Sequence, residues 1–298
     1  MVDYTVAGVE GGLCAPRGFR AAGVDAGLTS GPGPDLGLVV SQQTSVAAGR
    51  FTTHPFASAP VRWSRAQLQA AGMARAVLVH AGSANAATGP DGDADAAALA
   101  ARCAAAIGCP ASEVLLCGTG AVGVRLALAD AAEAADKATA ALGRRGSGEV
   151  ARAMTASGGV AREHAVAVAW SEGEVRIGGA AKASVPFAPA FEHPVDRGAA
   201  SATTLVLLTT DASVEAGVLD ALGTAGVTLE PGRVGVSFGP VTVVADGRSA
   251  SHDERAAAAV AAKSQVDLAV DLGIGPAAAT VTTTDLPPEA LRRHGGLD

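Results

Sequence analysis

The sequence ATTLVLLTTDA at residues 202–212 places two threonines directly before a short apolar run. The run contains leucine and valine but no Gly or Pro, so it predicts a buried strand at 204–209. A threonine before this strand has a chemical use if the peptide bond between Ala202 and Thr203 is cleaved. The freed α-amine, with an unperturbed pKa of about 7.7 to 8.0, then lies beside the Thr203 hydroxyl and can take its proton. The alternative is that Thr203 is an ordinary strand residue, since threonine is common in strands.

Short apolar runs alternate along the chain with Ala-rich segments, and glycines separate them, which predicts an α/β sandwich. Helices are predicted at 93–107 and 128–142, because each segment ends just before a glycine. Clustered Pro, Gly and charged residues predict exposed loops at 144–149 and 188–200. Strands are predicted, in chain order, at 36–40, 76–80, 114–117, 165–170, 204–209, 234–238, 241–245 and 266–270.

Composition limits the class of protein. The chain has 298 residues, of which 49% are hydrophobic, and no apolar run reaches membrane-spanning length. The net charge of −7 includes no block of like charges, so neither nucleic acid nor a membrane is expected as a partner. Residues 1–20 lack a basic stretch followed by an apolar one, which predicts a cytoplasmic location. Cys14, Cys103, Cys109 and Cys117 form no Cys-x-x-Cys pair, so we expect reduced thiols and no metal.

A series of blocks along the chain resembles one family of enzymes. The blocks are GFRAAG at 18–23, DLGLVVS at 35–41, AAGRFTTHPFASAPV at 47–61, AVLVHAGSANAATG at 76–89, CGTGAVG at 117–123, IGGAAK at 177–182, ATTLVLLTTDA at 202–212 and SFGPVTV at 237–243. In this order they resemble the self-processing ornithine acetyltransferase (glutamate N-acetyltransferase) family. The resemblance implies an αββα-type sandwich with a truncated C-terminal part. It also implies cleavage before Thr203 into segments 1–202 and 203–298, which form a heterodimer and allow a higher homo-oligomer.

The resemblance implies an acyltransferase that needs no cofactor. Thr203 would take an acyl group from an N-acylated amino acid or related amide and pass it to an amine acceptor. A Gly-Thr-Gly turn after an apolar strand can stabilise the oxyanion formed on the way, through the Thr119 hydroxyl and the Gly120 N–H. The family uses a Thr-Gly pair at this position, which implies the same roles here. The alternative is a plain turn in which glycine only relieves backbone strain.

Two further residues are candidates for substrate binding. By resemblance, Lys182 lines the active site, where it holds a carboxylate or lowers the pKa of the Thr203 amine. The alternative is a solvated surface lysine. Thr155 resembles a hydroxyl residue of the family that touches substrate, although the acidic position that follows it has become Ser157 or Gly158. The alternative for Thr155 is an ordinary loop or strand threonine.

The sequence departs from the family pattern in three places. Lys182 lies 21 positions before Thr203, about twice the family spacing, because of an extra segment around 187–200. Much of the family's second half is absent after Asp253, including the region that supplies an acidic substrate-binding residue. The polar tail, which contributes an Asn and a hydroxyl, is replaced by residues 287–294. We therefore expect an acceptor less polar than ornithine, or differently shaped, and a role in specialised biosynthesis.

Other functions remain open from the sequence. Water in place of the acceptor amine would make the protein an amidohydrolase or aminopeptidase, and loss of cleavage would make it an inactive paralogue that acts as a binding subunit. A Ser-His-Asp arrangement with His80 or His252 and with Asp211 or Asp253 is disfavoured, because no G-x-S-x-G motif is present. His193 lies near the predicted cleavage site and is expected in an exposed loop.

Overall fold

The computed structural model describes residues 4–52, 57–158, 161–171, 173–182, 203, 205–212 and 241–245. Helices and strands alternate along this part of the chain. In order they are β1 (Tyr4–Gly8), the 3₁₀ helix η1 (Gly12–Cys14), β2 (Phe19–Val24), β3 (Leu36–Arg50), α1 (Ala59–Ala71), β4 (Met73–His80), α2 (Gly89–Ile107), η2 (Ala111–Glu113), β5 (Val114–Gly118), α3 (Leu128–Ala140), α4 (Ser147–Thr155), β6 (Arg162–Trp170), β7 (Gly173–Lys182), β8 (Leu205–Thr210) and β9 (Val241–Ala245).

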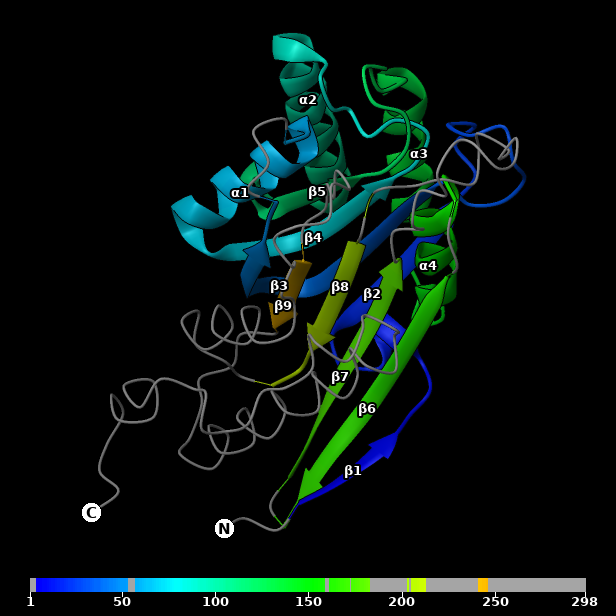
Figure 1. Ribbon diagram of the computed structural model, residues 1–298. Helices are drawn as coiled ribbons and strands as arrows, with labels where there is room; N and C mark the ends of the chain where they lie inside the picture. Colours follow the sequence, from blue (N-terminus) through cyan, green and yellow to red (C-terminus); the bar gives the residue numbers. More distant parts are fainter. Residues whose placement is uncertain are drawn as a thin grey trace, which may run out of the picture.

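The long strand β3 belongs to two sheets. Its first half pairs with β2 and β4, and β4 pairs in parallel with β5. Its end pairs with β9, which leads through β8, β7 and β6 to β1. The register with β4 shifts between Val40 and Ser45, and the Ser41 and Ser45 hydroxyl oxygens lie 2.9 Å apart there. Such an irregularity bends a strand and increases its twist, which allows β3 to pass from one sheet to the other (Figure 1).

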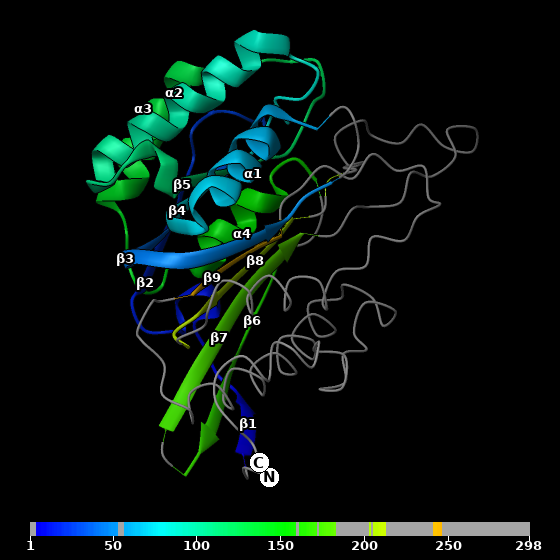
Figure 2. The same ribbon diagram turned by 90° about the vertical axis from the view of Figure 1, so that its left-hand side faces the viewer.

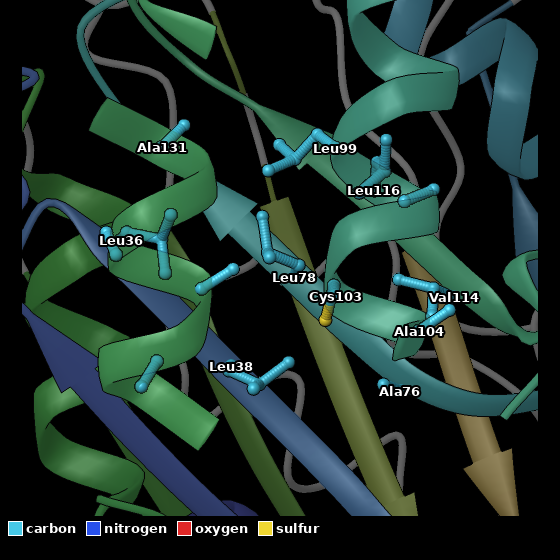
Figure 3. Close-up of a cluster of buried hydrophobic side chains, with 14 of the residues drawn as sticks. Leu36, Leu38, Ala76, Leu78, Leu99, Cys103, Ala104, Val114, Leu116 and Ala131 are labelled. Atoms are coloured by element: carbon cyan, nitrogen blue, oxygen red, sulfur yellow. The ribbon is translucent and has the colours of Figure 1, made fainter. Parts of the chain in front are cut away.

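Helices α1, α2 and α3 cover one face of the β2–β5 sheet (Figure 2). Alternate residues of the strands point to this face, as the two-residue period of a strand requires. On α2, the buried residues recur at the three- and four-residue spacing of a helix face. Figure 3 shows Leu78 and Leu116 of the sheet beside Leu99 and Cys103 of α2. The many alanines on these helices let the backbone lie close to the sheet.

A second core lies between the two sheets. Val79 on β4 and Cys117 on β5 face away from α1–α3 and share this core with Leu205 and Leu207 on β8. Helix α4 adds Met154, which is fully buried. The described residues therefore form an α/β fold with a helical layer and two stacked sheets, which confirms the predicted class. The predictions of a second helical layer and of a truncated C-terminal part concern residues outside those that the structure describes.

The structure extends the sequence prediction and corrects it at one loop. Six predicted strands and both predicted helices are present, whereas β1, β2, β7, α1 and α4 were not predicted. The predicted loop at 144–149 is wrong from Ser147 onward, because this residue begins α4. Its side chain is buried and accepts a hydrogen bond from the Leu13 N–H over 2.8 Å. The predicted strands 234–238 and 266–270 and the loop 188–200 lie outside the described residues.

The cysteines are free thiols, as predicted. Cys14, Cys103 and Cys117 are buried, and Cys109 is partly exposed. Burial raises the pKa of Cys14 and Cys109 to about 11 and that of Cys103 to about 12, so these thiols are protonated at neutral pH. Within the described ranges, no helix is long and apolar enough to cross a membrane, and no three His, Cys, Asp or Glu side chains form a metal-binding group.

Replacing Met154 by Ala tests the position of α4 in the core between the sheets. The change leaves a cavity beside both sheets, so we expect the free energy of unfolding to fall by about 2 to 5 kcal/mol in urea titrations. The matched control is Arg152→Ala on the same helix. Arg152 is exposed and pairs with Glu149, so its loss should cost less than about 1 kcal/mol. Equal effects of the two substitutions would contradict this packing.

Candidate active site

Lys182 and Thr119 meet in the interior of the protein. Lys182 is the last residue of β7 and Thr119 follows β5 directly, so the two come from different sheets. The Lys182 Nζ donates a hydrogen bond to the Thr119 Oγ1 over 2.5 Å, and both residues are 0% exposed. Lys182 is therefore not the solvated surface lysine that the sequence left open.

The alternation of side chains along the strands explains this meeting. Ala180 on β7 and Cys117 on β5 both belong to the core between the sheets. Lys182 and Thr119 each lie two residues further along their chain, so they point to the same interior. The buried ammonium therefore finds a polar partner at the end of an otherwise apolar core.

Thr203 lies at the same end of the β7–β8 pair. Lys182 is directly opposite Leu205 in the register of these strands, and Thr203 precedes Leu205 by two residues. Leu205 faces the core between the sheets. Thr203 itself is buried, with an exposed fraction of 4%. Ala202, on the other side of the predicted cleavage site, lies outside the described residues.

Burial changes the acid–base properties of Lys182. Loss of hydration disfavours the charged form and lowers the pKa of Lys182 to about 8. Most of the side chain is still protonated at pH 7, and an ammonium group can only donate hydrogen bonds. The Thr119 oxygen must then act as the acceptor, which leaves the Thr119 hydroxyl proton available for another partner.

The turn at Gly120 requires glycine. Its φ is +131°, and a Cβ built there would lie 2.4 Å from the carbonyl carbon of Gly82. The N–H groups on either side are bonded, from Thr119 to the His80 carbonyl and from Ala121 to the Gly82 carbonyl, both over 3.0 Å. Among the described residues, the Gly120 N–H has no backbone acceptor. This arrangement can offer a backbone donor to an oxyanion beside Thr119.

Thr155 is at the end of α4 and is partly exposed. Its hydroxyl donates to the Arg152 carbonyl over 2.9 Å, a bond that is common for threonine in a helix. Ser157, two residues later, bonds to both Gly82 and Thr119 and so joins this segment to the Gly120 turn. From the sequence, Ser157 is marked only as one of two residues, with Gly158, that replace an acidic position of the family. No local sequence signal marks its contacts, because its partners lie 75 and 38 residues away.

A His-Asp pair between His80 and Asp211 is not formed. His80 lies two residues after Leu78 on β4, so its side chain points to the face of the sheet that the helices cover. Lys182 lies on the other side of this sheet, in the core between the sheets. Burial lowers the pKa of His80 to about 4, so it is neutral at pH 7. Asp211 follows β8 at the end away from Thr203. Its carboxylate accepts hydrogen bonds from the backbone N–H groups of Arg17 and Arg176. His193, His252 and Asp253 lie outside the described residues.

Comparison with known proteins identifies relatives of this chain. The chain is 40% identical over 206 residues to the arginine biosynthesis bifunctional protein ArgJ of a Synechococcus strain, covering 69% of this chain and 47% of the relative. It is 36% identical over 209 residues to ArgJ of Streptomyces coelicolor, covering 70% of this chain and 51% of the relative. The chain thus spans about half the length of the curated relatives it matches.

Solved structures give the same result. ArgJ from Bacillus halodurans matches with a TM-score of 0.57 and 25% identity, over 62% of this chain and 97% of the solved one. Ornithine acetyltransferase from Mycobacterium tuberculosis, solved with ornithine, matches with a TM-score of 0.54 and 34% identity, over 62% and 98%. A β-aminopeptidase from Burkholderia, at 13% identity and a TM-score of 0.56, shares the fold. A family model described as ArgJ family matches residues 20–222 and 216–292, and the chain belongs to this family.

Proposed function

We propose that the protein is an acyltransferase in which Thr203, freed by cleavage after Ala202, is the nucleophile. The observation that carries the proposal is the buried Lys182–Thr119 hydrogen bond at the end of the β7–β8 pair where Thr203 precedes β8. Lys182 is the last residue of β7, Thr119 follows β5, and Thr203 lies two residues before the start of β8. The family resemblance gives these three residues roles in acyl transfer, which supports the proposal.

The proposed reaction consists of two half-reactions, formation of an acyl-threonine and transfer of its acyl group. The Thr203 α-amine takes the hydroxyl proton, and the hydroxyl oxygen attacks the carbonyl of an N-acylated amino acid or related amide. The Thr119 hydroxyl and Gly120 N–H stabilise the resulting oxyanion, and the protonated amine passes its proton to the leaving nitrogen. An acceptor amine then attacks the acyl-threonine, which releases the Thr203 hydroxyl and the new amide.

The pairing of strands supports a stable two-segment protein. β7 and β8 would belong to different segments after cleavage, yet they pair from Lys182–Leu205 to Ile177–Thr210, and β8 also pairs with β9. The solved ArgJ-family chains add support, because 97% and 98% of their lengths correspond to only 62% of this chain. That proportion is expected if each solved chain corresponds to one of two segments.

The buried charge supports a carboxylate-bearing substrate. Lys182 is fully buried beside Thr119, and the family resemblance gives it a role in holding a substrate carboxylate. We propose an N-acylated amino acid as donor for this reason, and Thr155 as a further contact to it.

We propose an acceptor less polar than ornithine, in specialised biosynthesis. A panel of acceptor amines, with transfer from N-acetylornithine to glutamate as the reference, measures this preference, and faster transfer to glutamate would overturn it.

Cleavage before Thr203 is the first test. Purified protein should give two fragments on denaturing gels, the second beginning at Thr203 by N-terminal sequencing, and the two should co-elute on size-exclusion chromatography. Thr203→Ala should abolish cleavage and turnover, because it removes the nucleophile, whereas Thr204→Ala should keep both. An intact wild-type chain without acyl transfer would favour the binding-subunit interpretation, and release of free acid without an amine would identify a hydrolase.

The pH dependence of stability tests the burial of Lys182. The pKa of Lys182 is about 8 in the folded protein and near 10.5 when unfolded, so between these values the unfolded chain binds more protons. Wild-type stability should therefore rise with pH across this range relative to Lys182→Met, by about 2 kcal/mol between pH 7 and pH 10 in urea titrations. Lys137→Met is the control, since Lys137 is exposed and Glu133 raises its pKa. A constant difference between wild type and Lys182→Met would contradict the burial.

A further inference from the structure

Ser157 makes two hydrogen bonds of opposite kind. Its Oγ accepts a hydrogen bond from the Gly82 N–H over 2.8 Å and donates one to the Thr119 carbonyl over 3.3 Å. A hydroxyl can do both at once, since it carries one donor and two acceptor positions. Ser157 thereby connects three segments: the end of α4, the loop after β4 and the turn after β5.

The bond to the Thr119 carbonyl fixes the direction of a different group. The peptide between Thr119 and Gly120 is planar and trans, so its C=O and N–H point in opposite directions. A hydrogen bond that holds the carbonyl toward Ser157 therefore holds the Gly120 N–H away from Ser157. Within the described part of the chain, this N–H has no backbone acceptor, whereas the N–H groups of Thr119 and Ala121 are both bonded.

We infer that Ser157 is a positioning residue that sets the direction of the Gly120 N–H as an oxyanion donor. The inference rests on the proposed acyl transfer, and it adds a residue that touches neither the substrate nor Thr203. Glycine at position 120 has a wide range of backbone angles, so this peptide needs an external constraint. A donor fixed before the reaction stabilises the developing charge without the cost of reorganisation.

The two bonds also explain why a hydroxyl suits position 157. An ionised carboxylate at this position would accept the Gly82 N–H but would have no proton for the Thr119 carbonyl. Alanine makes neither bond. Threonine retains the hydroxyl, so Ser157→Thr is the conservative variant that should keep the function.

Kinetics of the cleaved enzyme form the first part of the test. In Ser157→Ala, we expect kcat for acyl transfer to fall by about 10-fold to 100-fold with KM changed less than about 3-fold, because the donor acts on the transition state. Ser157→Thr should restore most of kcat. Ser64→Ala is the matched control: the buried Ser64 hydroxyl also donates to one carbonyl and accepts one N–H, both of Leu116, and should leave kcat within about 3-fold.

Nuclear magnetic resonance reads the same peptide without turnover. Labelling threonine with ¹³C at the carbonyl and glycine with ¹⁵N selects only Thr-Gly pairs, which occur in this sequence at Gly89 and Gly120. In Ser157→Ala, the Thr119 carbonyl and Gly120 amide signals should shift while the Gly89 signal stays in place. Ser157→Thr should return the signals toward their wild-type positions, and Ser64→Ala should leave them unchanged.

The two readouts separate the inference from the function on which it rests. Absence of acyl transfer by the wild-type protein would refute the proposed function, while the signal shift would still establish the control of the peptide by Ser157. An unshifted Gly120 signal in Ser157→Ala would overturn the inference even in an active enzyme. Equal losses of kcat in Ser157→Ala and Ser64→Ala would also overturn it, since both would then report general destabilisation.

Discussion

The hydrogen bond from the Lys182 ammonium to the Thr119 hydroxyl is the constraint around which the rest of the structure is arranged. A buried charge needs a polar partner, and here that partner comes from the other sheet. The sheets face each other because β3 is shared between them and its register shifts after Val40. Side-chain alternation along β5 and β7 then directs Thr119 and Lys182 to the same interior, and Thr203, just before β8, is also buried.

The sequence predicts the fold where periodicity is strong. The apolar runs of β4, β5 and β8 and the Ala-rich helices α2 and α3 follow the expected patterns. β7 was not predicted as a strand, because its segment IGGAAK at 177–182 is rich in glycine and alanine, and these residues have weak strand preference. Only its pairing with β6 and β8 defines it. α4 was missed because glycines and charged residues near Ser147 predict a loop, whereas the stability of this short helix comes from packing.

Part of the candidate site could also be predicted from the sequence, and part could not. The family resemblance predicts Thr119, Gly120, Lys182 and Thr203 as site residues, and the structure brings Lys182 and Thr119 together in the interior. The resemblance alone could not predict which of Lys182 and Thr119 donates the hydrogen bond between them, because this depends on the burial of both residues. Ser157 was missed as a contact residue because a serine's hydrogen bonds across loops depend on tertiary geometry and leave no local pattern.

The acyl-enzyme itself tests the central claim most directly. Wild-type protein would be incubated briefly with an N-acylated amino acid, quenched in acid and analysed by mass spectrometry after proteolysis. The account predicts one added acyl group on the peptide that begins with Thr203, lost again when an acceptor amine is supplied before the quench. An acyl group on another side chain, or full turnover by a chain still continuous through Ala202 and Thr203, would contradict it.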